Sequence, residues 1–291
     1  MRRTAIVLAT LASITLAAGC AVIVVPEDGN VKMHSAFSSD AVQGNGNVVV
    51  EQRAVATAVD DIDISGPMHV IVRVGEAPSV KVEGDSNLLP LLYTDASGGA
   101  LRIRAEGSMR SMNPLRVTVT TPRLRKLAAN GSGRLDVTGL NGGDLDLNLN
   151  GSRSVDVAGR VDRFTARLNG SGGLDATGLQ SGATEAALNG SGRLRLGRLQ
   201  GETLTLDLRG SGGASASGSV DRLQARLSGS GSVDLGQLTS RVAELTTNGS
   251  GSITASASGA LVAGSNGSGS ITVYGNPAQR TVSGKRITIV Q

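Results

Sequence analysis

Hydrophobic and polar residues alternate in short runs through most of the chain, and glycine-rich breaks separate these runs. Residues 69–74 (HVIVRV), 115–119 (LRVTV) and 145–149 (LDLNL) are typical. An alternation with a period of two predicts β-strands that bury one face and expose the other. We therefore expect a chain built almost entirely of short β-strands.

A four-residue unit, Asn-Gly-Ser-Gly with variants, recurs about every 20 residues in the second half of the chain. Strand patterns precede and follow each copy, and a second glycine break often comes later, as at Gly139, Gly159 and Gly178. Two strands and two turns thus fill each repeat. The eight copies begin at Asn130, Asn150, Asn169, Asn189, Arg209, Ser228, Asn248 and Asn266.

A repeat of this length cannot bury its own aliphatic face, whereas stacked repeats bury one another's. Backbone groups of neighbouring repeats can then pair at the roughly 4.8 Å spacing of β-strands. The sequence therefore predicts an all-β fold, a parallel β-helix or β-solenoid of about eight rungs of about 20 residues each. We expect the regular rungs over residues 128–273, with irregular caps at both ends.

The Asn-Gly pairs suit tight corners, because glycine adopts positive φ without strain and asparagine tolerates it. Asparagine side chains stacked at such a corner can also hydrogen-bond to one another as a ladder. Arg209 and Ser228 would interrupt that ladder. The turn-forming residues that we predict are Asn130, Gly131, Asn150, Gly151, Asn169, Gly170, Asn189, Gly190, Asn248, Gly249, Asn266 and Gly267.

Less regular strand patterns flank the array. Residues from about 55 to 121 alternate without a clear repeat, which is expected of a cap that covers the open end of a solenoid. Residues 274–291 read as a final, degenerate rung, whose free edge we expect Pro277 and the pair Lys285 and Arg286 to shield. Together these segments form one predicted domain over residues 55–289.

The composition narrows what can fill the core. Trp is absent, Tyr and Phe number 2 each, and Gly numbers 41. Leu, Val, Ile and Ala must therefore fill the interior. The net charge of +4 comes from 28 basic and 24 acidic residues that are interleaved along the chain. We expect a solvated mixed-charge surface and no nucleic-acid partner, because no basic patch stands out.

The first 20 residues have the pattern of an export signal. Arg2 and Arg3 precede a short apolar run, and small residues lead to Cys20, the single cysteine. We interpret residues 1–19 as a signal peptide and Cys20 as a lipidation site of the bacterial lipoprotein type, with an ordinary cleaved leader as the alternative. Residues 20–54 would then form a lipidated tether. We expect an exported protein held at the cell envelope through its acyl chains, with the outer membrane as its destination.

The rungs, the strand-rich lead-in and the Gly275-Asn276-Pro277 ending together resemble the head GIN domain family of auto-transporter adhesins. The resemblance covers roughly residues 55–289. It implies a β-helix and an envelope location, and it transfers no catalytic residues. A rigid rod would present a long flat face of small polar side chains, so we expect an envelope glycan or a surface protein as its partner.

One column of acidic residues is the strongest candidate for site chemistry. Asp136, Asp156, Asp175 and Asp234 each follow their turn by the same number of residues, so the first three would stack on adjacent rungs. Stacked carboxylates repel unless a cation or an arginine lies between them. Calcium is one alternative, but the spacing differs from the known calcium-binding repeat. We favour solvated charges on an outer face with arginines such as Arg134 nearby, and we predict no metal site and no cofactor.

An enzymatic function is the less favoured hypothesis. The chain has only two histidines, His34 and His69, and neither lies in the repeats. Parallel β-helix enzymes that act on polysaccharides place their residues on long loops, whereas these turns are short. We therefore predict a non-enzymatic, adhesin-like binding or structural module without catalytic residues. An envelope polysaccharide-acting enzyme that uses Asp156 or Asp175 is the alternative.

Overall fold

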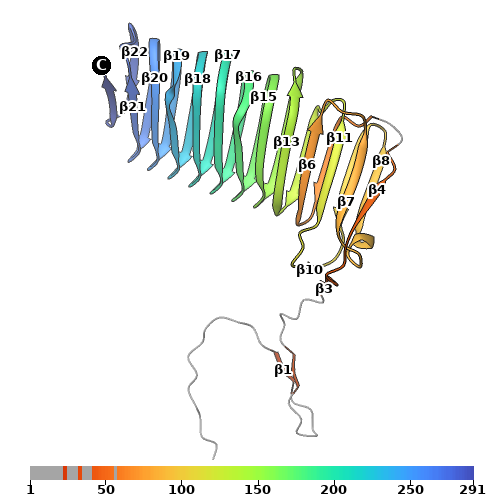
Figure 1. Ribbon diagram of the computed structural model, residues 1–291. Helices are drawn as coiled ribbons and strands as arrows, with labels where there is room; N and C mark the ends of the chain where they lie inside the picture. Colours follow the sequence, from red (N-terminus) through yellow and green to blue (C-terminus); the bar gives the residue numbers. More distant parts are fainter. Residues whose placement is uncertain (1–21, 25–31, 35–40, 56–57) are drawn as a thin grey trace, which may run out of the picture.

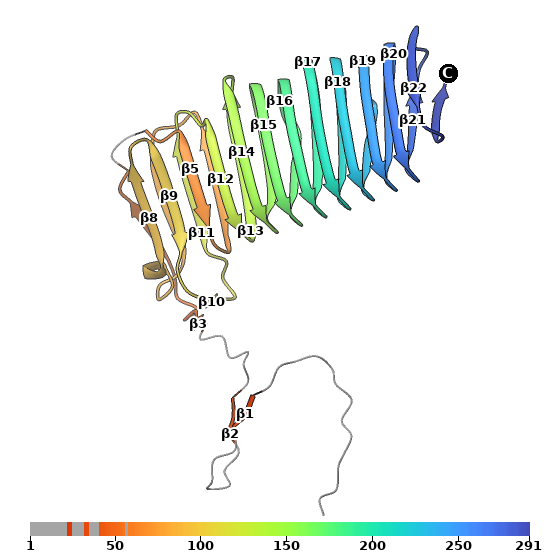
Figure 2. The ribbon, with the colours of Figure 1, turned by 180° about the vertical axis from the view of Figure 1, so that it is seen from behind.

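The computed structural model describes residues 22–24, 32–34, 41–55 and 58–291. Residues 41–55 and 58–291 form a rod of stacked β-rungs, with an irregular cap at the N-terminal end and the C-terminus at the opposite end (Figures 1 and 2). The architecture confirms the predicted β-solenoid. A short hairpin precedes the rod in the chain, in which β1 (Val22–Val24) pairs antiparallel with β2 (Lys32–His34).

The rungs follow one another in chain order and pair in parallel. Each strand from β15 to β20 is a whole rung that runs from one glycine-containing turn of the repeat to the next. The strands of the array are β12 (Lys126–Gly131), β13 (Gly133–Asn141), β14 (Asp144–Gly151), β15 (Ser154–Gly170), β16 (Gly173–Gly190), β17 (Arg193–Gly210), β18 (Gly213–Gly229), β19 (Ser232–Gly249), β20 (Ser252–Gly267) and β21 (Ser270–Tyr274).

Each rung has two corners, which we call the glycine corner and the open corner. The glycine corner holds the Asn-Gly-Ser-Gly turns, and it forms the edge of the rod where the arrowheads line up in Figures 1 and 2. At the open corner the strand bends without ending, so the prediction of two separate strands in every repeat is wrong for β15 to β20. Most register shifts between these neighbouring rungs fall in the segment around this bend, as between Asp156 and Ala158.

The N-terminal cap is a two-layered extension of the rod. On one face the strand order is β4-β7-β11-β6-β13, and on the other it is β8-β9-β5-β12-β14. Antiparallel pairs involving β7 and β8 end the parallel stacking here. The cap elements are β4 (Val48–Arg53), β5 (Asp61–Ser65), β6 (Met68–Val74), β7 (Ser79–Asp85), the 3-10 turn η1 (Leu89–Leu91), β8 (Leu92–Ser97), β9 (Ala100–Ala105) and β11 (Arg116–Thr121).

The folded body includes residues that the sequence assigned to the tether. β3 (Val42–Gln43) pairs with β10 (Met109–Arg110), and β4 is an edge strand of the cap. The buried carboxylate of Asp85 supports this region, because it accepts hydrogen bonds from Ser111 at 2.5 Å and Asn113 at 2.9 Å. These contacts join the segment that leaves the tether to the cap.

The C-terminal end is a final rung, as its pattern predicts. β22 (Gln279–Ser283) pairs with β20, and β23 (Ile287–Val290) pairs with β21. The predicted shielding of the edge by Pro277 is wrong, because Pro277 is buried in the loop before β22. Lys285 and Arg286 lie in the turn between the two strands, where Arg286 donates to the Ser268 carbonyl at 2.9 Å.

A single hydrophobic core runs the length of the rod. Aliphatic side chains at equivalent positions stack from rung to rung, as Leu168, Leu188 and Leu208 do beside the glycine corner. Phe164 is fully buried and is followed on its own rung by the small Ala166. Each rung depends on its neighbours to cover its apolar side chains. Their burial contributes roughly 25 cal/mol per Å² of apolar surface.

The stacking at the glycine corner leaves no room for a side chain. A Cβ atom on Gly190 would lie 2.3 Å from the Gly170 carbonyl oxygen of the preceding rung, and Gly190 has a φ of 127°. We expect Gly190→Ala to lower the free energy of unfolding by at least about 1–3 kcal/mol, because strain of the backbone alone costs that much. Urea denaturation of the full chain measures the change.

Ser191→Ala is the matched control, since Ser191 is the exposed next residue of the same turn. It should leave the unfolding midpoint within error of the wild type. Equal midpoints for Gly190→Ala and the wild type would contradict the close stacking of the turns.

Candidate functional site

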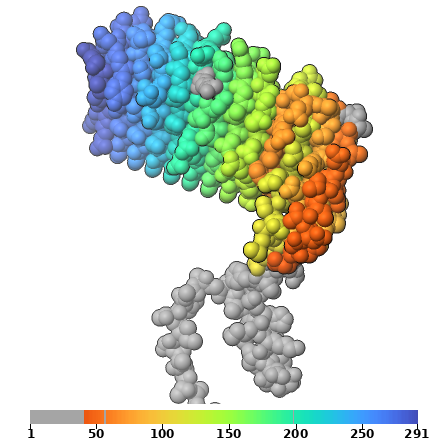
Figure 3. Space-filling view, in the orientation of Figure 1, coloured from red at the N-terminus to blue at the C-terminus, as the bar shows by residue number. Residues whose placement is uncertain are grey.

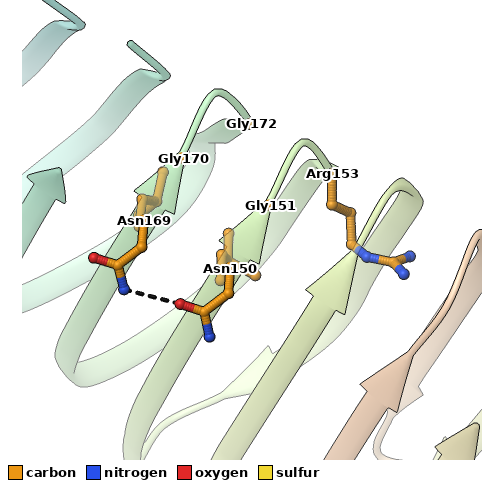
Figure 4. A pocket seen from close by; sticks show the side chains of 8 residues that line it. Asn150, Gly151, Arg153, Asn169, Gly170 and Gly172 are labelled. Carbon is orange, nitrogen blue, oxygen red and sulfur yellow. Dashed lines mark hydrogen bonds between the residues drawn. The ribbon is translucent and has the colours of Figure 1, made fainter. Parts of the chain in front are cut away.

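The glycine corner carries the asparagine ladder that the sequence predicts. The Asn150 amide donates to Asn130 at 2.9 Å, Asn169 donates to Asn150 at 2.9 Å, and Asn189 donates to Asn169 at 3.0 Å. The dashed line in Figure 4 marks one of these bonds. A second segment joins Asn266 to Asn248 at 3.0 Å, beyond the interruption at Arg209 and Ser228. The ladder is therefore a structural seam whose amides largely bond to one another.

Sequence reasoning missed one further turn at this corner. Ser65 pairs with Asn130, and Met68 pairs with Gly133, so residues 65–68 form the turn below the first predicted one. Gly66 has a φ of 120°, as the turn glycines of the array do. The signal was hidden because β7 to β11 are inserted between this turn and the next, which removes the regular spacing.

Arg153 occupies a position that is glycine in most of the other turns, and its side chain is 2% exposed. In Figure 4 the side chain points toward the N-terminal side of its rung, away from Asn169. Its guanidinium donates to the carbonyls of Gly66 at 2.6 Å and Met68 at 2.8 Å, and to that of Arg134 at 3.2 Å. Burial lowers the pKa of Arg153. Through these hydrogen bonds Arg153 links the regular rungs to the turn at residues 65–68.

The predicted acidic column exists. Asp136 pairs with Asp156 and Asp156 pairs with Asp175, so the three carboxylates lie on adjacent rungs of one face. Arg134 bridges the first two, with its Nε 3.0 Å from Asp136 and its Nη2 2.9 Å from Asp156. Arg195 follows in the column and donates to Asp175 at 3.3 Å. Asp234 lies two rungs beyond Arg195 and accepts from the Gly236 amide.

Asp136 also contacts a histidine of the cap. The His69 Nε2 lies 2.5 Å from the Asp136 carboxylate, in a half-buried position. Burial alone would raise the pKa of Asp136, but the hydrogen bonds from His69 and Arg134 outweigh it and lower this pKa. The Thr177 hydroxyl, 2.6 Å away, is the main cause of a lowered pKa at Asp175. Both carboxylates are therefore held in the ionised form by their neighbours.

Within the described ranges, no three His, Cys, Asp or Glu side chains come together in a group that could hold a metal ion. In the same part of the chain, no helix has the length and apolar character of a membrane span. Cys20 and the signal peptide lie outside the described residues, so lipidation stays a prediction. His34 belongs to β2, away from the residues of the column in the sequence.

The open corner carries a groove that the sequence did not indicate. Two adjoining hollows, of about 400 and 580 Å³, share the lining residues Gln200 and Gly201. Their other walls come from the bends of five neighbouring rungs, β15 to β19, and from Ser258 of the next. The lining combines serine, threonine, glutamine, acidic and arginine side chains with apolar surface from residues such as Val161 and Val220.

The matching family model carries the description "Putative auto-transporter adhesin, head GIN domain", and it matches residues 58–215 and 173–277. A comparison with curated proteins finds no match. Two solved structures illustrate the fold. A "putative lipid binding protein" from Parabacteroides distasonis has 24% identity and a TM-score of 0.65, over 86% of this chain and 100% of its own. A "putative adhesin" from Parabacteroides merdae has 18% identity and a TM-score of 0.64, over 87% and 100%.

Replacing the Arg153 side chain tests whether its hydrogen bonds to the turn at residues 65–68 stabilise the fold. Arg153→Met keeps the bulk and removes the donors, so buried carbonyls lose their hydrogen-bond partners. We expect the free energy of unfolding to fall by about 1–3 kcal/mol, measured by urea denaturation. Arg193→Met, at an exposed position of the face, should change it little. An Arg153→Met variant as stable as the wild type would show that the hydrogen bonds of the guanidinium do not stabilise the fold.

The acidic column makes stability depend on pH. The pKa of Asp136 is lowered in the folded state, so its contribution is complete above the unfolded pKa of about 3.9 and is lost as the pH falls through the lower folded pKa. We expect Asp136→Asn to lower stability at pH 7 by about 1–2 kcal/mol and to flatten the loss below about pH 4. Thermal unfolding across pH measures both effects.

Asp234→Asn is the control, because Asp234 lies in the same column without an arginine partner. It should retain the acid dependence of the wild type. An Asp136→Asn curve that stays parallel to the wild-type curve at every pH would rule out the assigned ion pairs.

Proposed function

Because the chain belongs to the head GIN domain family of auto-transporter adhesins, we propose that it is a non-enzymatic, adhesin-like binding module presented at the bacterial cell envelope. The observation that carries the proposal is the shape of the body. A continuous core and a ladder of paired rungs make a rod whose two ends lie far apart (Figure 1). Such a rod can hold a binding surface away from its point of attachment.

The direction of the rod supports presentation from an N-terminal anchor. The chain enters the body at β3 and β4 of the cap, and the C-terminal rung forms the opposite end. With Cys20 acylated as the lipoprotein pattern predicts, the cap would face the membrane and the last rungs would point away from it. Two or three acyl chains give stable anchoring without a transmembrane helix. We infer the outer membrane as the destination.

The surface also favours binding over catalysis. Figure 3 shows one face of the rod as an even surface of side-by-side rungs. The first three carboxylates of the acidic column are paired. Arg134 contacts Asp136 and Asp156, His69 contacts Asp136, and Arg195 contacts Asp175. A general acid or base needs a free proton-transfer position beside a substrate, and this column offers paired ions. An envelope glycan or a surface protein is the partner class that we propose.

Cells that carry the full-length chain should bind beads coated with a panel of glycans and surface proteins several-fold better than cells that lack it, for at least one coating. Cys20→Ser should abolish the incorporation of labelled palmitate and release the protein from the membrane fraction, with loss of bead binding. Protease treatment of intact cells should degrade the wild-type chain.

Each readout addresses a different part of the proposal. Unchanged palmitate labelling in Cys20→Ser would refute the anchor. Equal bead binding by cells with and without the chain, for every coating, would refute the adhesin-like function. Release of sugar from any coating by the wild-type protein, abolished in Asp156→Asn or Asp175→Asn, would favour the enzyme alternative.

A further inference from the structure

The groove at the open corner has two parallel columns of side chains. The inner column is Arg160, Gln180, Gln200, Ser219 and Thr239, which follow one another on successive rungs. The outer column is Asp162, Gly182, Glu202, Asp221 and Arg241. Both columns run along the rod, so the groove can follow a ligand that extends across several rungs.

Two glycines make the corner hollow. Gly182 leaves a gap in the outer column between Asp162 and Glu202. Gly201 lies so close to the preceding rung that a Cβ on it would be 1.7 Å from the Gly182 carbonyl oxygen. The floor between the columns is closed by buried residues such as Ser181 and Ser240. The Ser181 hydroxyl bonds to Thr184 and the Ser240 hydroxyl donates to the Ser256 carbonyl, so both of these buried hydroxyls already have a hydrogen-bond partner within the protein.

The side chains of the walls offer both donors and acceptors. Gln180 and Gln200 share one hydrogen bond of 2.9 Å, which leaves the other amide groups of both residues facing solvent. Ser219 and Thr239 add exposed hydroxyls. Among the charged groups of the outer column, Asp221 and Arg241 neutralise each other through contacts of 2.5 and 3.0 Å. The groove therefore combines one ion pair and three further charged side chains, Arg160, Asp162 and Glu202, with neutral polar groups.

We propose that this groove binds a linear, neutral oligosaccharide that lies along the axis of the rod. This inference rests on the proposed adhesin-like function and assigns the ligand class and the site to it. A neutral glycan presents hydroxyls that act as donors and acceptors at once, as the amides and hydroxyls of the inner column require. Rungs repeat at roughly 4.8 Å, a distance comparable to the length of one sugar unit in an extended chain.

Other ligand classes fit less well. A lipid needs an enclosed, mostly apolar cavity, whereas these hollows are open and carry charged and amide side chains beside their apolar surface. An added peptide strand needs an exposed sheet edge, whereas the strands at this corner already pair with rungs on both sides. An acidic polymer would be repelled by the carboxylates of Asp162, Glu202 and Asp221, which outnumber the two arginines of the groove. The lack of an aromatic platform among the lining residues predicts modest affinity that depends on ligand length.

The test is calorimetric titration of the full-length protein in mild detergent with β-1,4-linked glucose, xylose and mannose oligomers and α-1,4-linked glucose oligomers. At least one series should bind, with an affinity that rises with length to about five sugars, one for each rung at roughly 4.8 Å, and then levels off. Ser219→Arg places a bulky side chain in the middle of the inner column and should weaken that binding at least tenfold.

Ser230→Arg is the matched control, because Ser230 is an exposed serine of the glycine corner, at the opposite edge of the rod. It should bind as the wild type does. Both variants should unfold at the wild-type urea concentration, which excludes misfolding as a cause. The proposal is overturned if no series binds, or if Ser219→Arg binds as well as Ser230→Arg. Wild-type cells that still bind coated beads in that case would leave the adhesin-like function standing and remove this groove as its site.

Discussion

The pairing of each rung with the rung below it is the constraint on which the rest of the molecule depends. Parallel strands must approach to roughly 4.8 Å for their backbone groups to bond, and this distance has to hold around every corner. At the glycine corner the carbonyl oxygen of Gly170 lies only 2.3 Å from where a Cβ of Gly190 would be, and equivalent contacts recur at Gly210 and Gly229. Glycine is therefore required by contact between rungs as well as by the positive φ of each turn.

The two corners divide the tasks of the fold. The glycine corner is filled by its own backbone and by asparagine amides that bond to one another, so it stabilises the stack and offers little to a ligand. The open corner needs no turn motif, because its strands bend while they keep pairing, and its side chains vary from rung to rung. Apart from close-packed glycines such as Gly201, this variation falls at exposed positions such as Ser219 and Thr239. A binding surface can therefore change there without disturbing the stack.

The regular part of this architecture could be predicted from the sequence because one short unit marks each rung. The features that were missed depend on contacts between distant segments. The turn at Gly66 is separated from the array by the inserted cap strands, and β4 pairs with β7 although its sequence resembles a tether. The sequence shows that Arg153 departs from the repeat. It does not show that the side chain is buried against the carbonyls of Gly66 and Met68, because that contact joins segments far apart in the chain. The acidic column was predictable because register follows from the spacing.

Native-state hydrogen exchange of the full chain, resolved to the glycine corners of successive rungs, tests the central claim most directly. The amides of Ser191 and Ser211 donate across rungs to the carbonyls of Gly170 and Gly190, each at 3.1 Å. We predict that the amides of these exposed serines exchange slowly, with protection close to that of the buried strands beside them. Rapid exchange at these turns, with protection confined to the strands, would contradict a fold held together by stacking at this corner.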